Sequence, residues 1–232
     1  MKRTLSLLFV FVVLAISLCA CGKDDEHKKM VEEYRAAKMS AYTLENNTTD
    51  DYEIDVAFLG DSLTDMYDLE SYYPQYKVSN RGIGGDTTFD LEKRLKTSVY
   101  DLKPKAVVML IGANNPRNMF DNYEKILIGL KENLPNTKII ILSLTSMGGE
   151  WGKNNELTAY NNVKIKLLCE KHSLEYVDLY SPLFNLEDGE VYDEYVIDGG
   201  HLTPKGYEVI TENITPAIEK QLAIWHLENQ GK

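Results

Sequence analysis

The stretch IDVAFLGDSLTD, residues 54–65, decides the fold. Residues 54–59 form a short and largely apolar run, and Gly60-Asp61-Ser62 is a turn signal at its end. Two further runs, residues 106–111 and 138–144, are continuous and rich in β-branched side chains. Runs of this kind are typical of strands that are buried on both faces of a parallel sheet.

Outside these runs, the chain alternates between strand and helix patterns. Shorter strands are predicted at residues 77–79 and 175–177, and helices at residues 65–72, 89–98, 122–134, 156–172 and 204–225. A strand followed by a helix, repeated about five times, predicts an α/β fold: a three-layer α/β/α sandwich around a five-stranded, mostly parallel, doubly wound sheet. Ligands bind at the carboxyl ends of the strands in such sheets, so the loops that follow the strands are the places to seek a site.

The first twenty residues have the pattern of an export signal. Lys2 and Arg3 precede an apolar run over residues 5–18. This run would span ~21 Å as a helix, which is shorter than the ~30 Å hydrocarbon core of a membrane, so residues 1–20 are predicted to be a signal peptide. The sequence Leu18-Cys19-Ala20-Cys21-Gly22 resembles a bacterial lipobox. That resemblance implies lipidation of Cys21 and a lipoprotein anchored on the outer side of a bacterial cytoplasmic membrane; a plain secretory signal is the alternative.

The mature chain is predicted to have a linker and one domain. Residues 21–52 are polar and form the linker, with a possible helix over residues 27–42, and residues 53–228 form the domain. Within the domain, Cys169 lies in the helical apolar pattern of Leu157, Tyr160, Val163 and Leu167, which predicts a buried and unreactive thiol.

The charge balance excludes several classes of protein. The chain has 25 Lys and Arg against 36 Asp and Glu, a formal net charge of −11. A nucleic-acid binder needs clustered basic residues, so no nucleic-acid partner is expected. No polybasic patch is available for anionic lipids, so the predicted contact with the membrane is the lipid anchor alone. Three cysteines without a C-x-x-C pair predict neither a closed disulfide framework nor a zinc or redox site.

Polar residues or glycines follow each of the first three predicted strands. Ser62 stands in a tight turn where its hydroxyl can be exposed beside free helix N–H groups, although Asp-Ser is also an ordinary helix cap. The next loop, NRGIGGDTT at residues 80–88, has glycines that let backbone N–H groups approach a ligand, but it lacks the dinucleotide and phosphate-loop patterns. The third loop contains Asn114, which can donate into a cleft or cap a helix.

A fourth polar element lies near the C-terminus. Asp198 precedes His201 by three residues, so it can fold back and accept a hydrogen bond from Nδ1–H of the imidazole. That bond would leave Nε2 free to act as a base. The remaining histidines, His27, His172 and His226, have no comparable neighbour.

Together, the four elements resemble the four sequence blocks of the SGNH, or GDSL, hydrolase family. Gly60-Asp61-Ser62-Leu63 matches the first block, Gly85 the second, Asn114 the third, and Asp198 with His201 the fourth. Residues 82–88 and 112–115 are most similar to the branch that contains the small platelet-activating-factor acetylhydrolase subunits. The resemblance covers about residues 54–222 and implies the flavodoxin-like SGNH hydrolase fold and a carboxylic ester hydrolase.

The resemblance also implies a serine esterase mechanism through an acyl-enzyme. Ser62, His201 and Asp198 would be the catalytic triad. The backbone N–H groups of Ser62 and Gly85 and the side-chain amide of Asn114 would form the oxyanion hole. No cofactor and no metal ion are expected.

The predicted substrate is a short-chain ester, in particular an acetyl ester, of a small molecule or a glycan. A long-chain ester is less expected because the sequence contains no long apolar lid segment to shelter a fatty acyl chain. Trp151 and Asn115 are the candidate substrate contacts, and Trp151 could stack on a sugar or only pack on the surface. A lysophospholipase or other lipid acyl esterase, and an acyltransferase, would use the same residues. A non-catalytic ligand-binding lipoprotein is the alternative of another class.

Overall fold

The computed structural model describes residues 24–230, so the predicted signal peptide and the lipidation of Cys21 lie outside the described residues. The chain divides into two compact units, and the second unit begins at Tyr42. Helix α2 (Asp24–Thr48) contains the described part of the first unit and the beginning of the second. No helix within residues 24–230 has the length and apolar character needed to cross a membrane.

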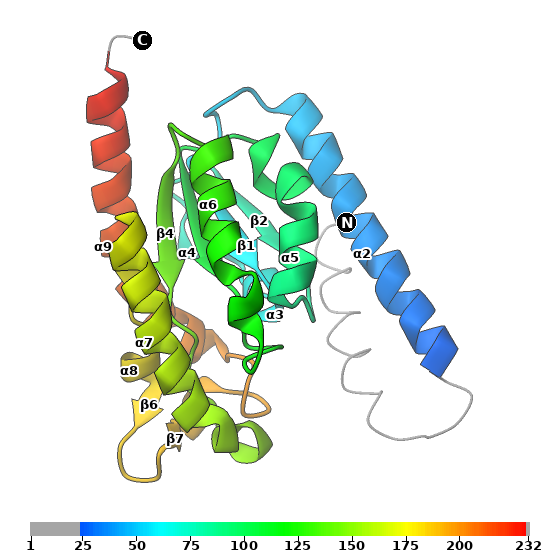
Figure 1. Ribbon diagram of the computed structural model, residues 1–232, viewed down its shortest axis with the longest axis vertical. Coiled ribbons are helices and arrows are strands. Elements are labelled where there is room, and N and C mark those ends of the chain that lie inside the picture. The colour runs from blue at the N-terminus through cyan, green and yellow to red at the C-terminus, as the bar shows by residue number, and fades with distance from the viewer. Residues whose placement is uncertain (1–23, 231–232) are drawn as a thin grey trace. The chain divides into compact units, whose positions relative to one another are not determined.

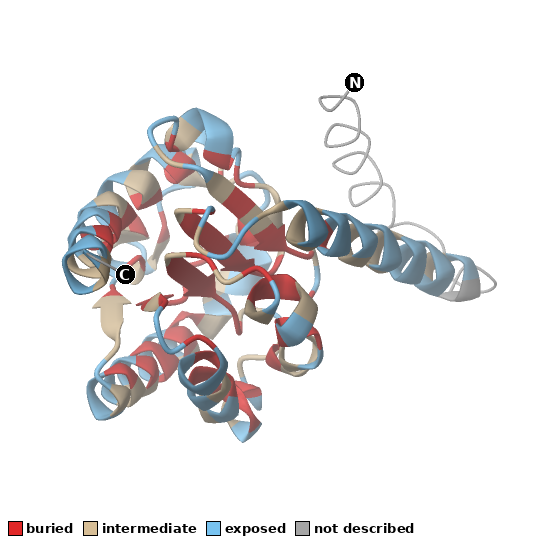
Figure 2. Ribbon diagram, turned by 90° about the horizontal axis from the view of Figure 1, so that it is seen from above, coloured by how far each residue is buried: buried red, intermediate tan, exposed pale blue. Residues whose placement is uncertain are grey.

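A five-stranded parallel sheet forms the centre of the second unit (Figure 1). Its strands lie in the order β2-β1-β3-β4-β5. They are β1 (Val56–Gly60), β2 (Val78–Gly82), β3 (Ala106–Leu110), β4 (Lys138–Leu142) and β5 (Glu175–Val177). Every residue of β1 and β3 is buried, and Figure 2 shows the buried strands at the centre of the unit. The predicted three-layer α/β/α sandwich is therefore confirmed.

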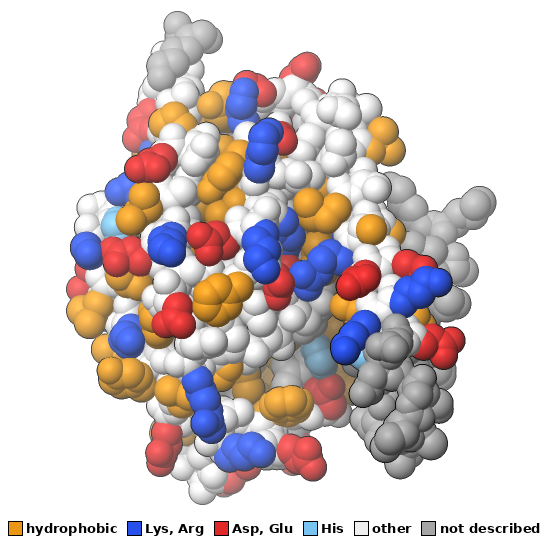
Figure 3. Space-filling model, turned by 45° about the vertical axis from the view of Figure 1, so that its right-hand side comes forward, with side chains coloured by type: hydrophobic (Ala, Val, Ile, Leu, Met, Phe, Trp, Pro, Cys, Tyr) orange, Lys and Arg blue, Asp and Glu red, His pale blue; other side chains and the backbone are white. Residues whose placement is uncertain are grey.

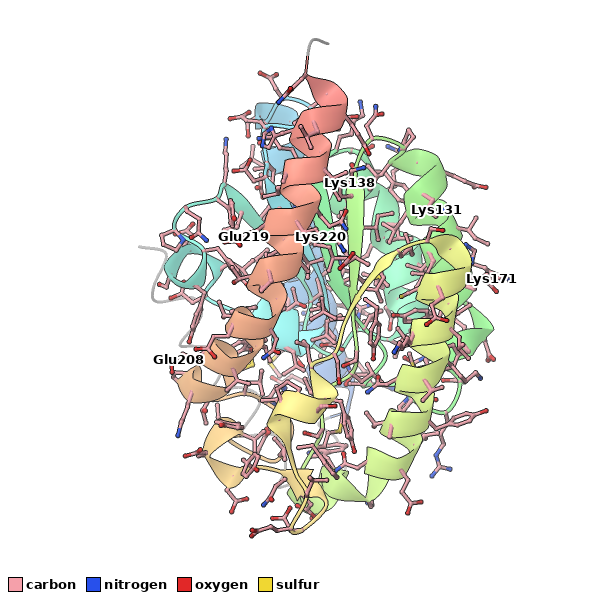
Figure 4. All side chains as sticks on the ribbon, turned by 90° about the vertical axis from the view of Figure 1, so that its left-hand side faces the viewer. Lys131, Lys138, Lys171, Glu208, Glu219 and Lys220 are labelled. Atoms are coloured by element: carbon pink, nitrogen blue, oxygen red, sulfur yellow. The ribbon has the colours of Figure 1, made fainter. Side chains whose placement is uncertain are left out.

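Helices cover both faces of this sheet because right-handed crossovers reverse their side where the strand order reverses. Helices α5 and α6 lie over one face in Figure 1, and Figure 4 shows α9 on the opposite side of β4 from α6 and α7. The helices are α3 (Ser62–Asp65), α4 (Leu69–Tyr72), α5 (Thr88–Leu95), α6 (Tyr123–Asn133), α7 (Asn155–His172), α8 (Tyr180–Leu183) and α9 (Pro204–Asn229). A small hairpin of β6 (Phe184–Asn185) and β7 (Glu190–Val191) lies between α8 and α9 in the sequence.

The helix predicted at residues 65–72 is wrong in detail, because the chain forms two short helices, α3 and α4. The side-chain amide of Asn80, at the middle of β2, donates to the carbonyl oxygens of Thr64 at 2.6 Å and Tyr67 at 3.1 Å. A continuous helix would use these two carbonyl oxygens as acceptors for its own backbone N–H groups. Here they accept hydrogen bonds from a side chain of β2 instead. The turn that follows Ser62 is fixed by β2 and not by a long helix.

The second unit begins about two helical turns before the end of α2, earlier than the predicted domain start at residue 53. Tyr42 is 3% exposed, and its hydroxyl donates to the carbonyl oxygen of Gly82 at 2.7 Å. Asn46 donates to the carbonyl oxygen of Thr97 at 2.7 Å. The last residues of α2 thus pack and bond as part of the sheet-containing unit, although the sequence around them is polar.

Cys169 on α7 is buried at 1% exposure, as predicted, and burial raises the pKa of its thiol to about 12. The apolar pattern from which this was predicted is nevertheless the exposed face of the helix. Tyr160, Val163 and Leu167 are 61%, 58% and 58% exposed.

The buried face of α7 carries asparagines instead, and their amides bind loops at the carboxyl edge of the sheet. Asn162 accepts from the N–H of Leu144 at 2.8 Å and donates to its carbonyl oxygen at 2.9 Å. Asn161 donates to the carbonyl oxygen of Pro116 at 2.8 Å. Buried polar side chains with these bonds are as well accommodated as apolar ones, so hydrophobic periodicity predicts the wrong face.

A cavity of about 310 Å³ lies at the amino ends of β4 and β5, at the opposite edge of the sheet from the loops discussed below. Lys138 and Glu175 line it, and Lys220 beside it bonds both carboxylate oxygens of Glu175 (Figure 4). On the face of the molecule in Figure 3, basic and acidic side chains are interspersed.

Candidate active site

Ser62 is the first residue of α3 and follows β1 after a single residue, Asp61. The carboxylate of Asp61 caps the helix by accepting from the N–H of Leu63 at 3.2 Å. In the parallel register, Gly60 pairs with Gly82 of β2 and Leu110 of β3, so the loops after these three strands begin at the same level. This geometry places the Ser62 turn beside the loops that carry Gly85 and Asn114.

Asp198, His201 and Ser62 form a continuous chain of hydrogen bonds. His201 Nδ1 is 2.7 Å from Asp198 Oδ2, and His201 Nε2 is 3.0 Å from Ser62 Oγ. Asp198 Oδ1 also accepts from the backbone N–H of His201 at 2.8 Å. The structure thus brings together residues 139 positions apart in the sequence, with the imidazole oriented by the carboxylate and facing the hydroxyl.

The environment of Asp198 keeps it ionised. Partial burial opposes the charge, but hydrogen bonds from the backbone N–H and imidazole of His201 and from the N–H of Gly200 outweigh it. The pKa of Asp198 is therefore lowered from its ordinary value. A charged carboxylate in this position stabilises a protonated imidazole.

The turn between Asp198 and His201 is held by the loop that follows β4. The backbone N–H of Gly148 donates to the carbonyl oxygen of Gly199 at 2.8 Å. Gly199 has a φ of +85°, and a Cβ at this position would lie 2.3 Å from the carbonyl oxygen of Gly148. The close approach of the two loops therefore requires glycine and fixes the position of the imidazole.

Gly85 and Asn114 lie together beside the nucleophile turn. Gly85 has a φ of +79°, and a Cβ there would meet no atom within 4 Å, so the space beside it is open. Asn114 Nδ2 donates to the carbonyl oxygen of Asp86, the next residue, at 2.9 Å. The N–H of Gly84 donates to Asp65 Oδ2 at 2.9 Å, which ties this loop to α3.

Two backbone donors at this edge have no partner in the described part of the chain. They are the N–H groups of Ser62, at the start of α3, and of Gly85. Unbonded N–H groups at a helix start attract a negatively charged oxygen. Together with the amide of Asn114, they can stabilise an oxyanion that forms on a group attacked by Ser62.

Sequence reasoning missed three buried charged groups under the site: Asp61, Asp86 and Arg94. Asp61 is 1% exposed, and burial raises the pKa of its carboxyl to about 7; the N–H of Leu63 opposes this shift and the charge of Asp86 adds to it. Arg94 on α5 is 6% exposed and bonds Asp86 Oδ2 at 2.6 Å. Charged residues are rarely buried, and no local pattern marks these three as exceptions.

The two candidate substrate contacts lie in different environments. Trp151 is 53% exposed, and a Cβ at Gly200 would be 3.7 Å from its ring, so the indole lies against the turn that carries His201. Asn115 accepts from the N–H of Thr88 at 3.1 Å and donates to its hydroxyl at 2.9 Å. The amide of Asn115 therefore joins two loops, while the indole of Trp151 presents an open surface. Within residues 24–230, no group of three His, Cys, Asp or Glu side chains is placed to hold a metal ion.

Comparison with known proteins identifies a family and relatives to which this chain is similar. The model of the GDSL-like Lipase/Acylhydrolase family matches residues 58–209. The platelet-activating factor acetylhydrolase IB subunit alpha2 of Rattus norvegicus is 30% identical over 183 residues, which are 74% of this chain and 79% of that protein.

Two solved structures have the same fold. A protein from Streptococcus pneumonia, assigned as a platelet activating factor, has a TM-score of 0.75 at 22% identity and covers 84% of this chain and 97% of its own. The acetylxylan esterase Axe2 of Geobacillus stearothermophilus has a TM-score of 0.59 at 19% identity and covers 72% and 95%.

Proposed function

Because the chain belongs to the GDSL-like lipase/acylhydrolase family and is a carboxylic ester hydrolase, we propose that it removes short acyl groups, acetyl in particular, from carbohydrate esters through an acyl-enzyme. The observation that carries the mechanism is the hydrogen-bonded chain from Ser62 through His201 to Asp198. The substrate class rests on the surroundings of that chain.

The first half of the reaction transfers the acyl group to the enzyme. His201 Nε2, 3.0 Å from Ser62 Oγ, is within reach to accept the hydroxyl proton. The serine oxygen then bonds to the ester carbonyl carbon, and the carbonyl π electrons move onto its oxygen. Asp198 stabilises the imidazolium, which passes the proton to the leaving alcohol as the tetrahedral intermediate collapses.

The second half returns the enzyme to its first state. A water molecule gives a proton to His201 and attacks the acyl-serine, and the imidazolium then protonates Ser62 as the carboxylic acid leaves. In both halves, negative charge develops on the carbonyl oxygen. The N–H groups of Ser62 and Gly85 and the amide of Asn114 donate to it, and each such donor is worth ~10²–10³ in turnover.

Replacing the nucleophile tests the mechanism. Ser62→Ala is expected to abolish hydrolysis of p-nitrophenyl acetate while the circular dichroism spectrum and the unfolding midpoint stay those of the wild type. Ser71→Ala, at an exposed position on α4, is the matched control and keeps full activity. Undiminished activity of Ser62→Ala contradicts the proposed mechanism.

The exposed indole of Trp151 beside the triad supports a carbohydrate substrate, because an aromatic face offers a stacking platform to a sugar ring. The similar acetylxylan esterase acts, by its name, on an acetylated polysaccharide. We expect activity to be highest with C2 esters in a series from C2 to C16. Trp151→Ala should raise KM for acetylated xylo-oligosaccharides and leave KM for p-nitrophenyl acetate unchanged.

A lipid ester is the second candidate substrate, because the curated relative is named for the hydrolysis of platelet-activating factor. A maximum at C8 or beyond in the same ester series would favour this candidate. Acyl transfer would use the same triad, with an alcohol in place of water. Product analysis in the presence of an added alcohol acceptor distinguishes transfer from hydrolysis.

The lipobox pattern supports a lipid anchor on Cys21 and a position outside the bacterial cytoplasmic membrane. Labelling with radioactive palmitate in a bacterial host should mark the wild type and not Cys21→Ser. Equal labelling of both proteins would contradict the anchor.

A further inference from the structure

Arg94 on α5 is a buried arginine that bonds two backbone carbonyl oxygens and two side chains. Its side chain is 5% exposed and donates four hydrogen bonds. Nε bonds Asp86 Oδ2 at 2.6 Å, and Nη2 bonds the carbonyl oxygen of Gly60 at 2.8 Å. Nη1 bonds the carbonyl oxygen of Arg81 at 3.0 Å and Ser98 Oγ at 2.8 Å. All four partner residues are buried.

The bonds of Arg94 lead to all three groups that face the developing oxyanion. Gly60 is the last residue of β1, and its carbonyl group precedes Ser62 by two residues. Asp86 follows Gly85 directly, and its own carbonyl oxygen accepts the amide of Asn114 at 2.9 Å. A single guanidinium thus connects the end of β1, which leads into the turn of Ser62, to the loop that carries Gly85 and binds Asn114.

We propose that the buried pair of Arg94 and Asp86 positions the oxyanion donors of Ser62, Gly85 and Asn114 for the transition state, and so sets kcat without contacting the substrate. The proposal rests on the proposed function, because it takes these three groups as the donors. Arg94 and Asp86 are positioning residues and not catalytic ones.

The geometry of the guanidinium is what this role requires. Arginine presents five N–H donors in a planar fork, whereas lysine presents one compact ammonium group on a flexible stem. A lysine at position 94 keeps the charge opposite Asp86, but its three N–H donors cannot replace the four hydrogen bonds of the guanidinium. Donors to an oxyanion act through fixed positions, so a small displacement lowers transition-state binding more than substrate binding.

Arg81 on β2 provides a matched control. It is 0% exposed, and its side chain bonds Ser79 Oγ at 2.7 Å and the carbonyl oxygen of Tyr42 at 3.4 Å and pairs with Glu45 at 3.1 Å. None of these partners carries or binds an oxyanion donor. Arg81→Lys therefore makes the same change at a buried arginine nearby, with no bond to the donor loops lost.

The experiment compares Arg94→Lys, Asp86→Asn and Arg81→Lys in the full chain with p-nitrophenyl acetate. We expect Arg94→Lys and Asp86→Asn to lower kcat at least tenfold while KM stays within twofold of the wild type. They should also weaken, by a similar factor, the binding of ethylboronic acid, which forms a tetrahedral adduct with a serine hydroxyl. Arg81→Lys should lower the unfolding midpoint and leave kcat unchanged.

The outcomes separate this proposal from the mechanism. Wild-type kcat in folded Arg94→Lys, an equal loss of kcat in Arg81→Lys, or a change in KM alone would overturn the positioning role. Failure of both Arg94→Lys and Asp86→Asn to fold would assign the pair to stability alone and would also overturn it. Ser62→Ala is measured alongside, because only activity in that variant would overturn the proposed function itself.

Discussion

Replacing Asp61 by asparagine should remove a pH-dependent penalty on the stability of the fold. Asp61 is 1% exposed, and its Oδ2 has no hydrogen-bond partner within the described residues. The side-chain amide of the Asp61→Asn variant would keep the oxygen that accepts from the N–H of Leu63, at 3.2 Å in the wild type, and would carry no charge. The substitution is nearly isosteric, so it isolates the ionisation of this one buried carboxyl.

The size of the effect follows from the pKa of Asp61, which burial raises from 3.8 to about 7. At ~1.4 kcal/mol per pH unit, this difference corresponds to ~4 kcal/mol of unfolding free energy. Below the lower of these values, the carboxyl is protonated in both states and there is no penalty. As the pH rises to about 7, the unfolded chain releases the proton that the folded state retains, so the wild type loses stability relative to the variant.

Urea unfolding of both proteins at several pH values between about 3.5 and 8 measures this difference. The free energy of unfolding of Asp61→Asn, minus that of the wild type, should increase by ~3–4 kcal/mol across the range. Asp121→Asn, at an exposed position, is the control that makes the same chemical change outside the buried site. A difference for Asp61→Asn that stays constant within ~1 kcal/mol would refute the reasoning.

Three further results are expected. Asn114→Ala should lower kcat for p-nitrophenyl acetate by ~10²–10³ with KM nearly unchanged, and a change in KM alone would mean that the amide binds substrate and transition state equally. Gly85→Ala should lower the unfolding free energy by ~1–2 kcal/mol in urea titrations, because alanine is strained at a φ of +79°. Unaltered stability would show that the loop takes up another backbone conformation without cost. Cys169 should resist iodoacetamide in the native protein and react in urea, because its thiol is buried and burial raises its pKa to about 12. Peptide mapping by mass spectrometry measures the modification, and a modified Cys169 in the native protein would contradict this expectation.

Some parts of the fold could be predicted because they depend on local patterns. The predicted strand at residues 138–144 and the predicted helix at residues 156–172 agree with β4 (Lys138–Leu142) and α7 (Asn155–His172) to within two residues. Continuous β-branched runs have few alternatives to a doubly covered strand. The buried face of α7 was not predictable in this way, because its asparagines are stabilised by loop carbonyl and N–H groups that are distant in sequence.

The site shows the same division. The types and order of Ser62, Asn114 and His201 follow from the sequence, and the resemblance to SGNH hydrolases adds the expected role of each. The pair of Arg94 and Asp86 and the raised pKa of Asp61 do not follow, because both depend on removal from solvent. The sequence shows which charged residues are present, and only the folded structure shows which of them are buried away from solvent.

The amino-acid sequence by itself determined the alternation of strands and helices. It also determined which polar side chains stand in the loops that follow the strands. Hydrophobic period, turn residues and helix caps act over a few residues, and this short range makes them readable from the chain. The tertiary structure alone decided that His201 meets Ser62 at 3.0 Å, that the last two turns of α2 pack as part of the sheet-containing unit, and that Arg94 connects the end of β1 to Asp86. These contacts join residues far apart in the chain, and their geometry is fixed only when burial and hydrogen bonding are satisfied for the whole unit together.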